Sequence, residues 1–165
     1  MKESDLYAPI KTHFQALGYK VKGEVGAADV MAVRGLEPPI IIELKLGFSL
    51  TLFHQAIQRL KVVDKVYIAV VRPEGKLGYK RLKANITLCR RLGIGLLTLR
   101  LRDQFIETHC VPSPYAPRKS VKKAKSMAKA FDRLDGDPND GGATRQGLVT
   151  GYRQDALKCA AYLLH

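Results

Sequence analysis

The sequence predicts an α/β fold, with a mixed β-sheet covered by helices and a basic C-terminal extension that ends in a helix. Two observations carry this prediction. Over residues 5–111, apolar residues at helical spacing alternate with short runs rich in Val, Ile and Tyr. Beyond residue 111 the composition changes to proline, lysine and glycine, so we expect the α/β core to end there.

The individual elements follow from spacing and from turn residues. Helical spacing predicts four helices, at residues 5–17, 50–63, 79–92 and 150–164. Short apolar runs predict six strands, at residues 19–25, 29–33, 40–45, 65–71, 94–99 and 104–111. The core order is therefore αβββαβαβ up to residue 99, and the strand at 104–111 follows it. The second and third strands are separated by a Gly- and Pro-containing turn, which favours a hairpin.

Three segments are expected along the chain. Residues 1–113 form the α/β core, residues 114–147 a basic linker or arm containing Pro and Gly, and residues 148–165 an amphipathic helix. This last helix reaches His165 without a stop signal. We therefore expect it either to fray there or to lead into a further segment of the natural chain.

Charge is the most informative part of the composition. The 165 residues include 28 Lys and Arg against 15 Asp and Glu, a net charge of +13, and 46% are hydrophobic. An excess of this size favours a polyanionic partner, nucleic acid before a membrane surface. The apolar runs are far shorter than the roughly 20 residues of a membrane span, and charges interrupt the start where a secretory signal would lie. We therefore expect a cytoplasmic protein with no membrane partner and with reduced, chemically inert thiols.

The strongest candidate site is the end of the strand at residues 40–45. Three isoleucines precede Glu43 and Lys45, which alternation places on one face, while Leu44 points to the other. If the hairpin forms, Asp29 falls opposite this segment. Two buried carboxylates repel, and a shared divalent cation resolves the conflict; oxygen ligands suit Mg²⁺ or Mn²⁺ rather than zinc.

Such a site predicts cleavage of a phosphodiester. A metal held by Asp29 and Glu43 would polarise a phosphoryl oxygen and acidify a water. Lys45 could orient or deprotonate that water, or offset negative charge in the transition state. In a protein of net charge +13, the DNA backbone is the substrate that fits best.

These residues resemble a known family. The run 26–30 (GAADV) followed by Glu43-Leu44-Lys45 is similar to the PD-(D/E)XK phosphodiesterase superfamily, which has the restriction-endonuclease-like fold and the core order αβββαβ. The whole chain looks like a bacterial branch of it, through the segments 24–26, 43–46, 55–56 and 150–157. The resemblance implies Asp29 and Glu43 as metal ligands, the Leu44 carbonyl as another and Lys45 as the catalytic lysine. Ala28 stands where the superfamily usually has proline, a departure that touches no ligand.

Other residues have weaker claims. Glu24 is either a third metal-binding acid or an exposed strand-end acid, and Glu3 is the alternative source of an extra carboxylate. Gln55 and Arg59 fall at the border of the apolar stripe of their helix; Gln55 either orients Lys45 or a phosphate, or is a surface residue. We expect nucleic-acid contacts from Arg59 and from the basic arm, at Lys119, Lys122, Lys123 and Lys125.

The leading hypothesis is an Mg²⁺- or Mn²⁺-dependent deoxyribonuclease. The alternative is a catalytically inactive DNA-binding or regulatory module on the same fold. Action on RNA is a weaker option, because the chain has no Trp and its other aromatic residues lie in core-like patterns. Members of the superfamily often dimerise to cut two strands, so a homodimer is expected from the resemblance alone.

Overall fold

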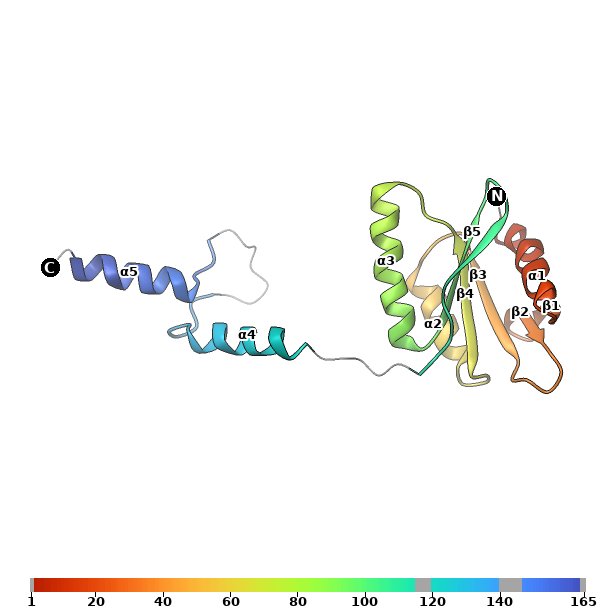
Figure 1. The fold of residues 1–165 in the computed structure, drawn as a ribbon, viewed down its shortest axis with the longest axis horizontal. Helices are drawn as coiled ribbons and strands as arrows, with labels where there is room; N and C mark the ends of the chain where they lie inside the picture. The colour runs from red at the N-terminus through yellow and green to blue at the C-terminus, as the bar shows by residue number, and fades with distance from the viewer. Residues whose placement is uncertain (1, 115–119, 140–146, 164–165) are drawn as a thin grey trace. The chain divides into compact units, whose positions relative to one another are not determined.

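A six-stranded sheet forms the centre of the N-terminal part of the chain (Figure 1). The computed structural model describes residues 2–114, 120–139 and 147–163. These fall into two compact units, Met1–Pro117 and Arg118–His165. The first unit has the predicted mixed α/β architecture, which is compatible with a restriction-endonuclease-like fold.

The strands follow one another across the sheet in chain order. The pairs β3·β4 and β4·β5 are parallel and the other three pairs are antiparallel. The sheet is therefore mixed, and β3 is the strand at which antiparallel pairing gives way to parallel pairing. The bounds are β1 Lys20–Val25, β2 Ala28–Val33, β3 Ile40–Lys45, β4 Lys65–Val71, β5 Gly95–Arg100 and β6 Phe105–Cys110.

Helices cover both faces of the sheet (Figure 1). The helical elements of this unit are η1 Glu3–Leu6, α1 Tyr7–Ala16, α2 Leu50–Arg59 and α3 Gly75–Leu92. One apolar cluster joins α1 to one sheet face, and a second joins α2 and α3 to the other. In β3, Ile42 and Leu44 belong to the first cluster and Ile41 to the second. Because side chains alternate along a strand, Glu43 lies on the α2 side of the sheet.

The predicted hairpin between β2 and β3 is confirmed. The paired residues are Val30 with Ile42 and Ala32 with Ile40. Within the connecting turn, the Glu37 N–H donates to the Arg34 carbonyl at 3.0 Å, and the two side chains form an ion pair with Nε and Oε1 2.8 Å apart. The register fixed here brings the N-terminal end of β2 beside the C-terminal end of β3.

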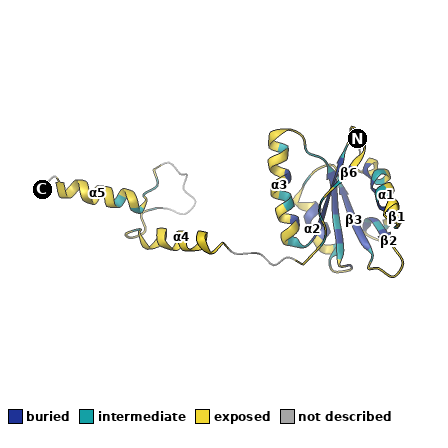
Figure 2. Cartoon of the chain, in the orientation of Figure 1, coloured by how far each residue is buried: buried dark blue, intermediate teal, exposed yellow. Residues whose placement is uncertain are grey.

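The second unit contains two helices, α4 Val121–Asp132 and α5 Gly151–Leu163. Neither helix buries a described residue, and Figure 2 colours both almost entirely as exposed. Ion pairs join α5 to the residues just after α4: Arg133 Nη2 lies 3.0 Å from Asp155 Oδ2, and Lys158 Nζ lies 3.0 Å from Asp135 Oδ2. The apolar stripe expected on the last helix therefore covers no core in the described residues. The three-segment division of the chain stays a prediction.

Two further observations complete the fold. The helix expected from residue 79 begins one turn earlier, at Gly75, and ends at Leu92; its C-cap is Gly93, whose φ of +73° suits a glycine. None of the helices in the described parts of the chain is long and apolar enough to span a lipid bilayer.

Candidate active site

Glu43 is the one acidic residue in the described core that is fully buried. It lies near the end of β3 with 0% of its surface exposed. Because a buried carboxylate loses its hydration, burial raises the pKa of Glu43, and a hydrogen bond from Arg59 opposes this shift. Buried charges are retained only where they are paired or bind a cation. The arrangement around Glu43 therefore needs a positive partner.

Arg59 is that partner in this structure. It ends α2, and its Nε lies 2.7 Å from Glu43 Oε1. Its Nη2 also donates a hydrogen bond to the Ala27 carbonyl in the β1–β2 turn. One guanidinium thus joins α2, β3 and the β1–β2 turn. The sequence indicated only that Arg59 borders the apolar stripe of its helix, and its predicted contact with nucleic acid stays a prediction.

Asp29 lies beside Glu43, as the hairpin predicts. Continuing the β2–β3 register by one residue from Val30 and Ile42 places Asp29 opposite Glu43. Asp29 Oδ2 accepts a hydrogen bond from the Leu44 N–H at 2.8 Å. This contact fixes the Asp29 carboxylate against the end of β3. The two acids proposed from sequence therefore meet at one place on the sheet.

Two buried oxygens near this edge have no hydrogen-bond partner among the described residues. They are Glu43 Oε2 and Gln55 Oε1. Gln55 lies one turn before Arg59 on α2, on the same side of the helix. Buried polar atoms without a hydrogen-bond partner are uncommon in native proteins, and they are often explained by a bound ion, a water molecule or a functional role. Arg59 thus holds Oε1 of Glu43, while Oε2 has no hydrogen-bond partner among the described residues.

The donor set fits Mg²⁺ or Mn²⁺. Asp29 and Glu43 supply carboxylate oxygens, and the backbone carbonyl of Leu44 is adjacent in sequence. Mg²⁺ keeps several waters and is commonly bound through one or two carboxylates, so two acids suffice. In the described residues no group of three or more His, Cys, Asp and Glu side chains is arranged to hold a metal.

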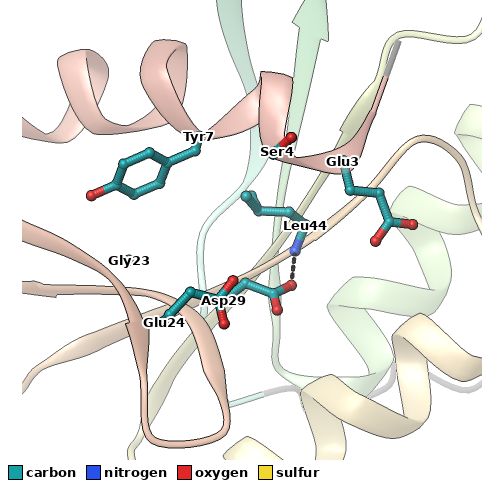
Figure 3. Close-up of a pocket in the computed structure, with 7 residues that line it drawn as sticks. All are labelled: Glu3, Ser4, Tyr7, Gly23, Glu24, Asp29 and Leu44. Atoms are coloured by element: carbon teal, nitrogen blue, oxygen red, sulfur yellow. Dashed lines mark hydrogen bonds between the residues drawn. The ribbon is translucent and has the colours of Figure 1, made fainter.

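A pocket of about 420 Å³ opens next to Asp29 (Figure 3). Glu3 from η1 and Glu24 from β1 both line it, together with Asp29, so both sequence candidates for an extra carboxylate are at hand. Glu24 lies opposite Asp29, between the pairs Gly23–Val30 and Val25–Ala28. Its φ of +51° is uncommon for a residue other than glycine, and such backbone outliers cluster at functional sites.

Lys45 is held by η1. Its Nζ lies 2.8 Å from Glu3 Oε2. The role predicted for Gln55, to orient Lys45 or a phosphate, stays a prediction. The hydrogen bond to Glu3 raises the pKa of Lys45 above its ordinary value, and the side chain is an ammonium at neutral pH. An ammonium donates hydrogen bonds and offsets negative charge, but it does not take up a further proton.

The predicted basic arm belongs to the second unit. Lys122, Lys123 and Lys125 are exposed on α4, and Lys119 lies outside the described residues. Their predicted contacts with nucleic acid stay predictions. Sequence reasoning missed a second basic element, α3, which carries six Lys and Arg residues and no Asp or Glu along its whole length.

Comparison with known families agrees with the resemblance noted from sequence. Residues 96–165 match the model of the family described as "Putative PD-(D/E)XK phosphodiesterase (DUF2161)". The match supports the resemblance to this superfamily over residues 96–165. The matched part runs from β5 through α5 and does not include Asp29, Glu43 or Lys45, whose assignment depends on the geometry above. No curated protein and no solved structure matches the chain.

Proposed function

We propose that this protein is a divalent-metal-dependent phosphodiesterase that hydrolyses the DNA backbone. The observation that carries the proposal is the meeting of Asp29 and Glu43 on adjacent strands, with Glu43 Oε2 buried and without a hydrogen-bond partner among the described residues. The family match supports the phosphodiesterase chemistry, and the net charge of +13 supports a polyanionic substrate.

Each residue has a role set by its surroundings. Asp29, Glu43 and the Leu44 carbonyl would hold Mg²⁺ or Mn²⁺, which when bound supplies a Lewis acid for the phosphoryl oxygen. Lys45, kept as an ammonium by Glu3, would donate to the phosphate and offset the charge that develops on its oxygens. Hydrolysis forms one P–O bond from water and breaks one P–O ester bond, leaving a phosphomonoester and a hydroxyl group.

Arg59 has a supporting role in this proposal. It binds Oε1 of Glu43 and so fixes which carboxylate oxygen is left for the metal. Glu24 and Glu3 border the same pocket, where a further carboxylate could bind a second ion. Because Lys45 already bonds Glu3, Glu24 is the better candidate for that second position.

The test is cleavage of plasmid, single-stranded and branched DNA with Mg²⁺ or Mn²⁺. Asp29→Ala and Lys45→Ala should each abolish the metal-dependent product. Asp64→Ala is the matched control, because Asp64 is exposed just before β4, at the end of the strands opposite the candidate active site. Cleavage that survives in Asp29→Ala or Lys45→Ala, or that is lost equally in Asp64→Ala, would reject the proposal.

A second candidate is a DNA-binding module without turnover. One observation favours it: Glu43 and Lys45 are both engaged in ion pairs, with Arg59 and Glu3. Both candidates predict DNA binding that weakens steeply with salt. Only the phosphodiesterase predicts a metal-dependent product, so the cleavage assay separates them.

A further inference from the structure

The outer surface of α3 carries a row of positive charge that the site description does not use. At about 100° per residue, four of its cations fall within an arc of about 80° along the helix. The buried residues Leu82 and Cys89 lie about 130° round from the centre of this arc. We call these four exposed residues the α3 basic stripe: Lys76, Lys80, Lys83 and Arg90.

The stripe has a cost that folding alone does not explain. Lys76 and Lys80 are four residues apart and Lys80 and Lys83 three apart, spacings at which like charges repel on a helix. Surface helices usually intersperse acidic residues, yet α3, which is described throughout, contains none between Gly75 and Leu92. A polyanionic ligand would remove this repulsion.

The first turn of α3, which carries Lys76, lies near the candidate active site. Lys45 pairs with Val70 on β4, and β4 leads directly into α3. A pocket of about 480 Å³ is lined by Gly47 and Phe48 after β3 and by Gly78 and Arg81 of α3. At about 100° per residue, Gly78 and Arg81 lie on the other side of the helix from the stripe, so this pocket locates the start of α3. The start of α3 therefore lies at the same end of the sheet as the C-terminal end of β3.

The dimensions of the stripe suit a duplex. Lys76 and Arg90 are 14 residues apart, which is about 21 Å along a helix. That length matches the rise of about six base pairs, at about 3.4 Å per base pair along one strand. Phosphate contacts of this kind position a duplex without reading its sequence.

We propose that the α3 basic stripe binds the phosphate backbone of duplex DNA next to the candidate active site. The inference rests on the proposed function, because it names the surface that holds that substrate. It differs from the sequence prediction, which placed nucleic-acid contacts at Arg59 and on the basic arm after residue 113.

Binding without divalent metal tests the stripe separately from hydrolysis. The assay is fluorescence anisotropy with a labelled DNA duplex of about 20 base pairs in EDTA, titrated at several salt concentrations between about 50 and 200 mM. The test variant is Lys80→Glu/Lys83→Glu. The control is Lys20→Glu/Lys61→Glu. Lys20 begins β1 and Lys61 follows α2, and both lie towards the end of the strands opposite the candidate active site. Each pair changes the net charge from +13 to +9, since two Lys→Glu changes remove four charges.

The stripe variant should bind at least about tenfold more weakly at about 0.1 M salt, with the slope of log K against log salt reduced by about 2. The control should bind within about threefold of the unmodified protein. Circular dichroism checks that both fold, and Lys76→Gln/Arg90→Gln offers a second test at the ends of the stripe, with the same expected change of slope.

Three results would overturn the inference. The first is unchanged binding by the stripe variants; the second is an equal loss in the control, which would assign binding to net charge. The third is tighter binding of an RNA duplex of the same sequence. Metal-dependent cleavage is measured in parallel, so stripe-dependent binding without any cleavage would reject the phosphodiesterase and leave the stripe standing.

Discussion

Replacing Arg59 with methionine should destabilise the protein strongly, because it leaves Glu43 buried without its cation. The Glu43 side chain is 0% exposed and that of Arg59 is 18% exposed, so the pair is shielded from water. Removing one partner of a buried ion pair costs about 3–5 kcal/mol. Against a typical total of about 5–15 kcal/mol, this is a large part of the free energy of unfolding.

The assay is urea unfolding followed by circular dichroism, with metal chelated, in a double-mutant cycle with Glu43→Gln. With the charge of residue 43 removed, Arg59→Met should cost much less, and the difference between the two backgrounds should be about 2–3 kcal/mol. Arg100→Met is the control: its partner Asp103 is 42% exposed, and such surface pairs contribute about 0–1 kcal/mol.

The reasoning is refuted by either of two outcomes. One is a cost below about 1 kcal/mol for Arg59→Met, as for an exposed pair. The other is an equal cost in the Glu43 and Glu43→Gln backgrounds, which would mean that Arg59 stabilises the fold through the Ala27 carbonyl or through packing alone.

Three more predictions follow from other contacts. Glu3→Gln should lower the pKa of Lys45, because their hydrogen bond raises it; an NMR titration of the lysine side chain measures the shift, and an unchanged midpoint contradicts the pairing. A hydrogen bond from Cys89 lowers the pKa of Cys110 to about 7, so the rate of Cys110 alkylation should rise with pH with a midpoint near pH 7. Cys89→Ala should move this midpoint upward, as measured by mass spectrometry of the alkylated peptide. An unchanged midpoint in Cys89→Ala would contradict the interaction. Gly23→Ala should lower the free energy of unfolding in urea by about 1–3 kcal/mol, because the added Cβ would lie 2.9 Å from Cε2 of the Tyr7 ring. Combining it with Tyr7→Leu should recover part of this loss. If the costs of the two substitutions simply add, the strain lies elsewhere.

Strands whose residues are buried on both faces could be located closely from sequence. The predicted bounds of β3 and β4 match the structure, because their apolar runs end at charged or turn residues. The start of α3 was missed because Gly75 and the residues after it carry no apolar periodicity. The helix α4 was not predicted either, since its lysine-rich sequence reads equally well as a solvated arm.

The site shows the same division between local and long-range information. Asp29, Glu43 and Lys45 could be placed together because strand alternation and one hairpin register are local rules. The pairing of Arg59 with Glu43 depends on how the end of α2 packs over β3, which periodicity does not determine. Cys89 and Cys110, expected to be inert, lie in one apolar cluster because α3 packs against β5 and β6, and Cys89 lowers the pKa of Cys110.

The most direct test of the account is a crystal of this protein soaked in Mn²⁺ and measured for anomalous scattering. The account predicts a peak bound by the carboxylates of Asp29 and Glu43, with the Leu44 carbonyl beside it and Arg59 still on Oε1 of Glu43. A crystal in which the two carboxylates remain without an ion at saturating Mn²⁺, or in which the ion binds elsewhere, would contradict it.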